Sequence, residues 1–136
     1  MVSKSDYMEN AVLNHALGDG TFTHVTPMFM ALCTTIPTDA STGATIVEAN
    51  YTGYVRLSLA ASDFSAASAG SKTNSAALTF AACSGGDDTV VGFVIIDSVT
   101  GGAGNVHYWG TTTSKVIDVN NTPPTIAIGG LVVTED

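Results

Sequence analysis

The stretch TVVGFVIIDSVTGGAGNVHYWGTTT, residues 89–113, decides the fold of this chain. Residues 89–98 are β-branched and aromatic on both alternating faces, which is typical of a central strand covered on its two sides. Residues 99–105 contain three glycines and an asparagine, and this composition is a strong turn signal. The alternation resumes in residues 106–113. The stretch therefore predicts an antiparallel hairpin between residues 93 and 110.

Similar patterns on both sides of the hairpin predict the other strands. Residues 25–35, VTPMFMALCTT, are apolar on both faces and predict a second central strand. Residues 53–62, GYVRLSLAAS, alternate and predict a half-exposed strand, with Val55 pointing inward and Tyr54 and Arg56 pointing outward. Shorter strands are predicted at residues 73–83, 115–119 and 125–135, and Gly129 and Gly130 predict a bulge in the last of them. Residues 36–50 predict a long ordered loop. About eight short strands separated by turns indicate a mainly β fold, an antiparallel β-sandwich or jelly roll.

One helix is expected in front of these strands, at residues 5–18, SDYMENAVLNHALG. Ser3, Ser5 and Asp6 are each able to cap its start, and Gly18 supplies its end. Apolar side chains recur along one broad side at helical spacing: Met8, Val12, Leu13, Ala16 and Leu17. Because about fourteen residues form only a marginal helix in isolation, this helix must dock. Its partner is either an open end of the sandwich or a neighbouring subunit.

The length of 136 residues fits one domain, residues 1–136, with the helix at 5–18 and the β-sandwich at 25–134. Charged residues make up only 12% of the chain, so much of the surface must consist of small uncharged side chains. Such a surface suits a protein that neighbouring subunits partly cover, because charged residues are depleted at interface cores. A weakly charged monomer is the alternative.

The charge balance argues against contact with nucleic acid. Twelve acidic residues outnumber four cations and give a net charge of −8; the cations are Lys4, Arg56, Lys72 and Lys115. Phosphate binding depends on clustered lysines and arginines, and these four are dispersed. The chain shows neither a signal peptide nor a membrane-spanning stretch, so we expect synthesis in a cytoplasm and no membrane contact. Cys33 and Cys83 are then expected to be buried free thiols.

No arrangement of residues predicts catalysis, a metal or a cofactor. The fragment GSKT, residues 70–73, lacks the glycine directly before lysine that a phosphate-binding loop requires. Ser84 lacks the preceding glycine of a nucleophile elbow. His15, His24 and His107 are dispersed without metal-ligand spacing, so we expect surface or structural roles for them. The sequence therefore predicts a protein that is not an enzyme.

Five stretches of the chain resemble, in order and spacing, a family of small virion proteins of tailed bacteriophages. These stretches are DYMENAVLNHALG, ALCTTIPTDA, GYVR, NSAALTF and GFVIIDSVTGGAGNVHYWG. Members of the family are labelled either capsid cement (decoration) proteins or tail-fibre proteins. The resemblance implies a structural virion component with a jelly-roll-like fold and no catalytic residues. Cys33 departs from the family pattern, since a bulky aromatic residue is expected at its position.

The function that this resemblance favours is that of a capsid cement protein. In this role a dimer or trimer binds the major capsid protein on the outside of the phage head and strengthens the joints between shell subunits. The net charge of −8 suits the exterior, because packed phosphates fill the interior. The alternative is a tail-fibre or receptor-binding component, in which Tyr51, Tyr54 and Trp109 contact a host glycan or protein.

The candidate interface residues are Tyr7, Val12, Leu17, Tyr54, Arg56 and Trp109. Arg56 is the strongest single candidate, because it is one of four cations and is predicted on an outward strand face, where it could form a charge-assisted hydrogen bond. An ordinary solvated arginine is the alternative, since exposed charges contribute little.

Overall fold

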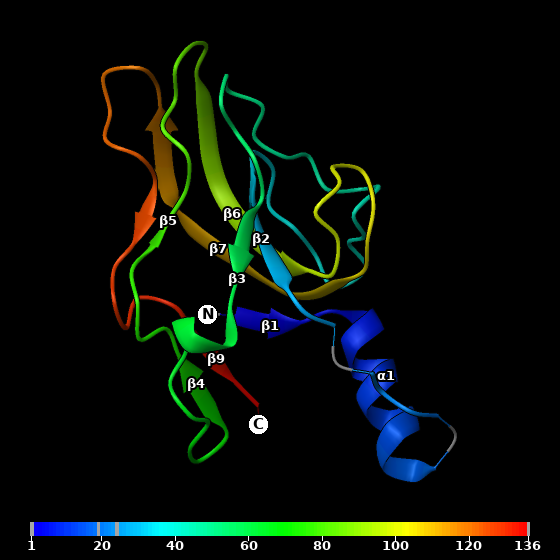
Figure 1. Cartoon of the computed structure of the whole chain (residues 1–136). Helices are drawn as coiled ribbons and strands as arrows, with labels where there is room; N and C mark the ends of the chain where they lie inside the picture. Colours follow the sequence, from blue (N-terminus) through cyan, green and yellow to red (C-terminus); the bar gives the residue numbers. More distant parts are fainter. Residues whose placement is uncertain (1, 19, 24, 136) are drawn as a thin grey trace.

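The computed structural model describes residues 2–18, 20–23 and 25–135, and it consists mainly of short β-strands with one α-helix near the N-terminus (Figure 1). The elements are, in chain order, β1 (Val2–Lys4), α1 (Asp6–Leu17), β2 (Met28–Cys33), β3 (Leu57–Leu59), the 3-10 helix η1 (Ala61–Asp63), β4 (Ser71–Thr73), β5 (Leu78–Thr79), β6 (Asp88–Ile96), β7 (Val106–Ile117), β8 (Thr125–Ile126) and β9 (Val132–Thr134). The predicted class, mainly β with a single N-terminal helix, is confirmed.

The hairpin predicted from the opening stretch lies at the centre of the main sheet. β6 and β7 pair antiparallel, with Phe93 opposite Gly110 and Val94 opposite Trp109. The sheet continues on both sides in the order β1-β7-β6-β2-β3, and every neighbouring pair is antiparallel. β2 and β6 are therefore interior strands, as their apolar sequences predicted.

Both faces of the interior strands β2 and β6 are covered. On one face, Met30 and Ile95 belong to the larger apolar cluster, which reaches Leu78 of β5 and packs against Val133 of β9. The two-stranded sheets β4–β9 and β5–β8 thus close over this face. A smaller cluster occupies the other face and contains Ala31, Cys33, Val94, Ile96 and Val106, with Ile46 and Trp109 packed against it. Residues alternate between the two clusters because successive strand side chains point to opposite faces.

The shorter strands differ from their predictions. Within residues 53–62 only Leu57–Leu59 forms a strand, because Gly53, at a φ of 99°, places a turn before it. Within 73–83 the strand is interrupted: Thr73 ends β4, and pairing in a strand resumes only at Leu78–Thr79. The predicted strand at 115–119 is the end of β7 rather than a separate element. Gly129, at a φ of 76°, forms a turn between β8 and β9 in place of the expected bulge. β1 and β4 were not predicted, since three residues carry no readable periodicity.

α1 has the predicted bounds and is anchored at its N-terminal end. The Ser5 hydroxyl accepts a hydrogen bond from the Met8 amide at 3.3 Å, and Gly18, at a φ of 91°, ends the helix. Ser5 also fastens the helix to β7, because its amide donates to the His107 carbonyl at 3.0 Å and its hydroxyl donates to the Val106 carbonyl. The rest of α1 extends away from the sheet (Figure 1). Met8 is the one buried residue within α1, so most of its predicted apolar side is uncovered.

Candidate interface

The uncovered surface of α1 is an apolar stripe on the side opposite Met8. At 100° per residue, Leu13 and Leu17 lie about 140° and 180° around the helix from Met8. Their exposed fractions are 56% and 79%. Leucines four residues apart are neighbours on a helix surface, so the two side chains form one continuous apolar patch. Asp6 and Glu9 lie on the same side in the first turn. We call this patch, with its two acids, the outer face of α1.

Three of the predicted interface residues lie on α1. Leu17 is on the outer face, and Val12 is exposed at the side of the helix. Tyr7 is 41% exposed, and the centre of its ring lies 5.3 Å from that of the buried His107. Tyr7 therefore helps to hold the helix against β7, while part of its side chain is available for contact, as are Val12 and Leu17.

The prediction that Tyr54 and Arg56 point outward is wrong. Arg56 is only 6% exposed, and Val55, predicted inward, is 63% exposed. The guanidinium of Arg56 donates two hydrogen bonds to the Glu48 carboxylate, from Nε to Oε2 at 3.0 Å and from Nη2 to Oε1 at 2.5 Å. Its Nη1 donates to the carbonyls of Ser98 and Ala103 at 2.6 and 3.0 Å. Arg56 thus ties the loop 36–50 to the β6–β7 turn, and it is not an exposed contact residue.

Tyr54 completes this buried polar cluster. Its hydroxyl donates to Oε2 of Glu48 at 3.1 Å and accepts from the Leu32 amide at 3.0 Å. Burial acts to raise the pKa of Glu48, but the hydrogen bonds and charge of Arg56, with the Tyr54 hydroxyl, hold it below its ordinary value of 4.5. Glu48 is therefore ionised at neutral pH and paired on both oxygens. This arrangement gives each member a structural role.

Trp109 is partly buried and also has a structural role. Its indole Nε1 donates to the Lys4 carbonyl at 3.1 Å and to Oδ1 of Asp39 at 2.9 Å, so it joins β1 to the loop 36–50. Its ring packs against the smaller apolar cluster. The polar atoms of Trp109 and Tyr54 therefore form hydrogen bonds within the protein, which argues against a role for these side chains as a glycan platform.

Cys33 and Cys83 are buried free thiols, as predicted. Burial, together with the nearby Glu48 charge, raises the pKa of Cys33 to about 12. Because the thiolate is the reactive form, we expect Cys33 to resist iodoacetamide at pH 8 in the native protein and to react fully in guanidinium chloride. Peptide mass spectrometry after both treatments measures this difference. Rapid native alkylation of Cys33 would contradict the packing described for β2.

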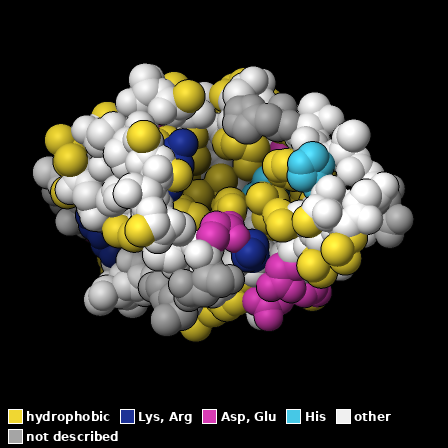
Figure 2. Space-filling view, turned by 90° about the horizontal axis from the view of Figure 1, so that it is seen from below, with side chains coloured by type: hydrophobic (Ala, Val, Ile, Leu, Met, Phe, Trp, Pro, Cys, Tyr) yellow, Lys and Arg dark blue, Asp and Glu magenta, His cyan; other side chains and the backbone are white. Residues whose placement is uncertain are grey.

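A groove that the sequence did not predict opens on the underside of the molecule. It has a volume of about 420 Å³ and lies between α1 and the β4–β9 pair. Figure 2 looks into this hollow and shows mostly hydrophobic side chains within it. Its apolar lining comes from at least five separate segments and includes Met8, Phe22, Phe64, Ile95 and Val133. We call it the underside groove.

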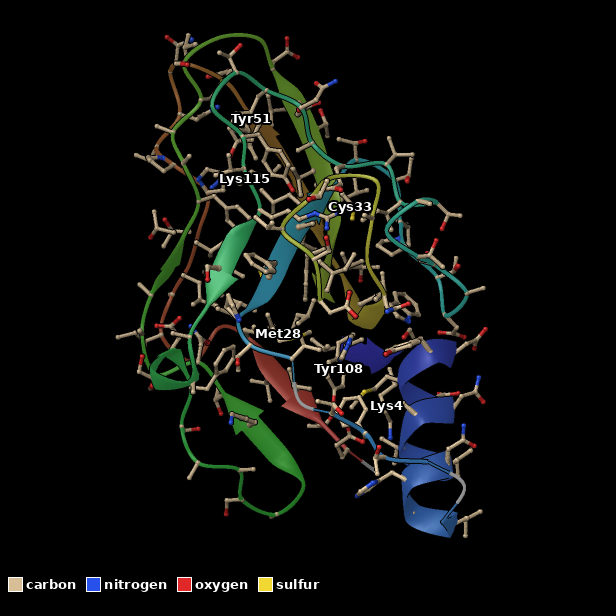
Figure 3. The ribbon with its side chains drawn as sticks, turned by 45° about the vertical axis from the view of Figure 1, so that its right-hand side comes forward. Lys4, Met28, Cys33, Tyr51, Tyr108 and Lys115 are labelled. Atoms are coloured by element: carbon tan, nitrogen blue, oxygen red, sulfur yellow. The ribbon has the colours of Figure 1, made fainter. Side chains whose placement is uncertain are left out.

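Charged and polar side chains line parts of the underside groove. Glu135 accepts a hydrogen bond from the Tyr108 hydroxyl at 2.6 Å and forms an ion pair with Lys4. The labelled side chains of Met28, Tyr108 and Lys4 lie between α1 and the β4–β9 pair in Figure 3. Lys72, on β4, also lines the groove, with its Nζ 5.9 Å from the centre of the Phe64 ring. These residues are far apart in the sequence, which is why no motif indicated the site.

The described residues, 2–18, 20–23 and 25–135, contain no cluster of His, Cys, Asp and Glu suited to a metal ion. The Nδ1 atom of His15 accepts a hydrogen bond from the Phe22 amide at 3.4 Å. His107 is buried, with Nε2 3.7 Å from Oδ2 of Asp97, and His24 lies outside the described residues. Within the same ranges, no helix has the length and apolar character needed to cross a membrane.

Comparison with known families assigns this fold to a group of phage proteins. The family described as "Podophage GP4 fiber I protein gp80" matches residues 3–134. The chain belongs to this family. The match to the gp80 fibre family runs from Ser3 in β1 to Thr134 in β9, so it includes the helix and nearly all residues of the main sheet and of the underside groove. No curated protein matches the chain.

Membership in the gp80 fibre family confirms the coarser part of the predicted resemblance, a structural protein of a bacteriophage virion. The label of the family is that of a fibre protein rather than a cement protein. A location in the virion follows at the same coarse level, while a position on the outside of the head stays a prediction.

Proposed function

We propose that this protein is a structural subunit of a phage fibre and that it acts through contacts with other virion proteins. The observation that carries the proposal is the fibre-family match over residues 3–134, nearly the whole chain. Two unpartnered apolar surfaces, the outer face of α1 and the underside groove, support it, because exposed apolar patches of this kind mark interaction sites. In this proposal the chain catalyses no reaction and contacts neither nucleic acid nor membrane.

A capsid cement protein is the second candidate. Its support is the low charged fraction of 12% combined with a net charge of −8, which suits a protein covering the outside of a shell packed with phosphates. In that case a dimer or trimer of the protein binds the major capsid protein at joints of the head. The exposed residues Val12 and Leu17 serve as contacts in either role.

Copy number and position in the virion distinguish the two roles. Quantitative mass spectrometry of purified particles should give tens of copies or fewer for a fibre subunit, and hundreds for a protein that covers the head. Immunogold electron microscopy of the same particles should place the label on fibres in the first case and over the head in the second. Absence of the protein from purified virions would overturn both.

A further inference from the structure

We infer that α1 of one copy docks in the underside groove of a second copy of this chain. The inference deepens the proposed structural role and rests on it for the expectation that copies meet in an assembly. It starts from two complementary features of one molecule. The outer face of α1 presents Leu13 and Leu17 to solvent, and the underside groove presents a mostly apolar lining.

The shapes of the two surfaces fit the helix-in-groove mode of recognition. A helix that docks in this way inserts side chains spaced three or four residues apart, and Leu13 and Leu17 have this spacing, about 6 Å along the axis. The groove volume of about 420 Å³ is within the range of pockets that receive such groups. Met8, Met28, Phe22 and Phe64 supply adaptable thioethers and flat rings for the contact.

The charges of the two surfaces are also complementary. Of the four cations of the chain, Lys72 lines the groove. Lys4 does not line it but neutralises Glu135, which does, so the positive charge offered to a partner comes from Lys72. The docking helix carries Asp6 and Glu9 in its first turn, on the same side as its leucines. A helix inserted along the groove can therefore bring Glu9 to Lys72. An opposite-charge pair at the rim favours this orientation over the reverse.

The groove cannot be filled by the helix of the same molecule. Met8 is the residue by which α1 contributes to its own groove, and Leu13 and Leu17 lie on the far side of the helix from it. The contact must therefore join different copies, with the helix of each inserted into the groove of the next. Such a heterologous contact builds a ring when its rotation closes and a row of subunits when it does not.

The first test uses sedimentation and multi-angle light scattering of the purified full chain. Wild-type protein should associate at micromolar concentration, and the double variant Leu13→Gln/Leu17→Gln should associate at least tenfold more weakly. Its thermal unfolding should match that of the wild type, because both side chains are exposed. Val47→Gln removes an apolar side chain that is 50% exposed and lies outside both surfaces, and it is the control. A wild-type protein that stays monomeric at high concentration overturns the inference and points to a different virion protein as the occupant.

The second test distinguishes the helix-to-groove contact from a symmetric dimer, in which both copies use the same surface. Ala61→Trp fills the groove from η1 and leaves α1 intact, while Leu13→Gln/Leu17→Gln leaves the groove intact. Each variant alone should be largely monomeric, and their mixture should form a dimer with one copy of each. No dimer in the mixture, or association of either variant alone at wild-type strength, contradicts the proposed contact.

A charge exchange tests the orientation of the helix. Lys72→Glu should weaken association about tenfold, and the added change Glu9→Lys should restore it in the doubly changed protein. Loss without restoration would contradict the Glu9–Lys72 contact. These measurements need only purified protein, so they do not depend on the copy number in virions. A protein that stays monomeric in solution overturns the contact between copies alone. Absence of the protein from virions overturns the structural role alone.

Discussion

Replacing Arg56 with methionine is expected to lower the free energy of unfolding by about 3–5 kcal/mol, the usual cost of removing one partner from a buried ion pair. The side chains of Arg56 and Glu48 are 1% and 14% exposed, so the remaining carboxylate would lose its counter-charge and have little access to water. The carbonyls of Ser98 and Ala103 would lose their donor as well. A loss of this size lowers the melting temperature by about 10–17 °C in a domain of this length.

Two further variants make this result interpretable. Lys115→Met removes a charge from an exposed position on β7 and should change stability by less than about 0.5 kcal/mol. The double variant Arg56→Met/Glu48→Leu removes the stranded carboxylate, so it should recover part of the loss, because an apolar pair can replace a buried ion pair. Equal melting temperatures for the wild type and Arg56→Met would show that the network contributes no stability.

The same pair predicts the pH dependence of the Arg56→Met defect. Because the pKa of Glu48 is depressed in the folded protein, its contribution is complete above its ordinary value of 4.5 and is lost as the pH falls through the folded pKa. In Arg56→Met the isolated carboxylate gains no such stabilisation, and protonation relieves it. The difference in stability between wild type and variant should therefore shrink below pH 4.5. Urea unfolding between pH 3 and pH 7 measures this change, and a constant difference would contradict it.

Replacing Gly104 with alanine is the second change with a large expected effect. Gly104 adopts a φ of 100°, a region that costs a non-glycine residue about 1–3 kcal/mol. A Cβ atom there would also lie 2.6 Å from the Cβ of Ser98 and 2.8 Å from Oδ1 of Asp97. Crowding of this kind adds about 1–3 kcal/mol, so we expect a total loss of about 2–6 kcal/mol in urea unfolding.

Gly102→Ala separates the two contributions to the Gly104 defect. Gly102 lies in the same turn at a φ of 74°, but a Cβ atom added there meets nothing within 4 Å. This control should therefore show only the backbone cost, and Gly104→Ala should exceed it clearly. The comparison matters because the turn supplies the carbonyl of Ala103 to Arg56. Equal losses for both variants would show that crowding at Gly104 is absent.

The parts of the fold that local sequence predicted are those in which local pattern and tertiary contact agree. Residues 89–113 carry β-branched runs around a glycine-rich turn, and they form the β6–β7 hairpin because three glycines and an asparagine between the strands favour the turn. The helix at 5–18 has a cap at each end, Ser5 and Gly18, and these interactions are satisfied within a few residues. Both elements could therefore be predicted from the local sequence alone, without knowledge of the segments that pack against them.

The position of Arg56 shows why alternation alone was insufficient. The alternating pattern of residues 53–62 placed Arg56 on an outward face, but the chain becomes a strand only at Leu57. The partner that draws Arg56 inside is Glu48, which lies in a loop with no periodicity. The energy of that pair depends on burial by the β6–β7 turn, a distant segment, and a local pattern contains no information about it.

The sequence by itself determined the class of this protein: a mainly β domain with one capped helix, little charge, and the residues of a phage virion family. Only the tertiary structure decided which of its residues are free to make contacts. In the structure, Tyr54, Arg56 and Trp109 form internal hydrogen bonds. Segments as far apart in the sequence as Met8 and Glu135 lie together around the underside groove. The physical reason is that a strand or helix forms from neighbours in sequence, whereas exposure and grooves result from long-range packing.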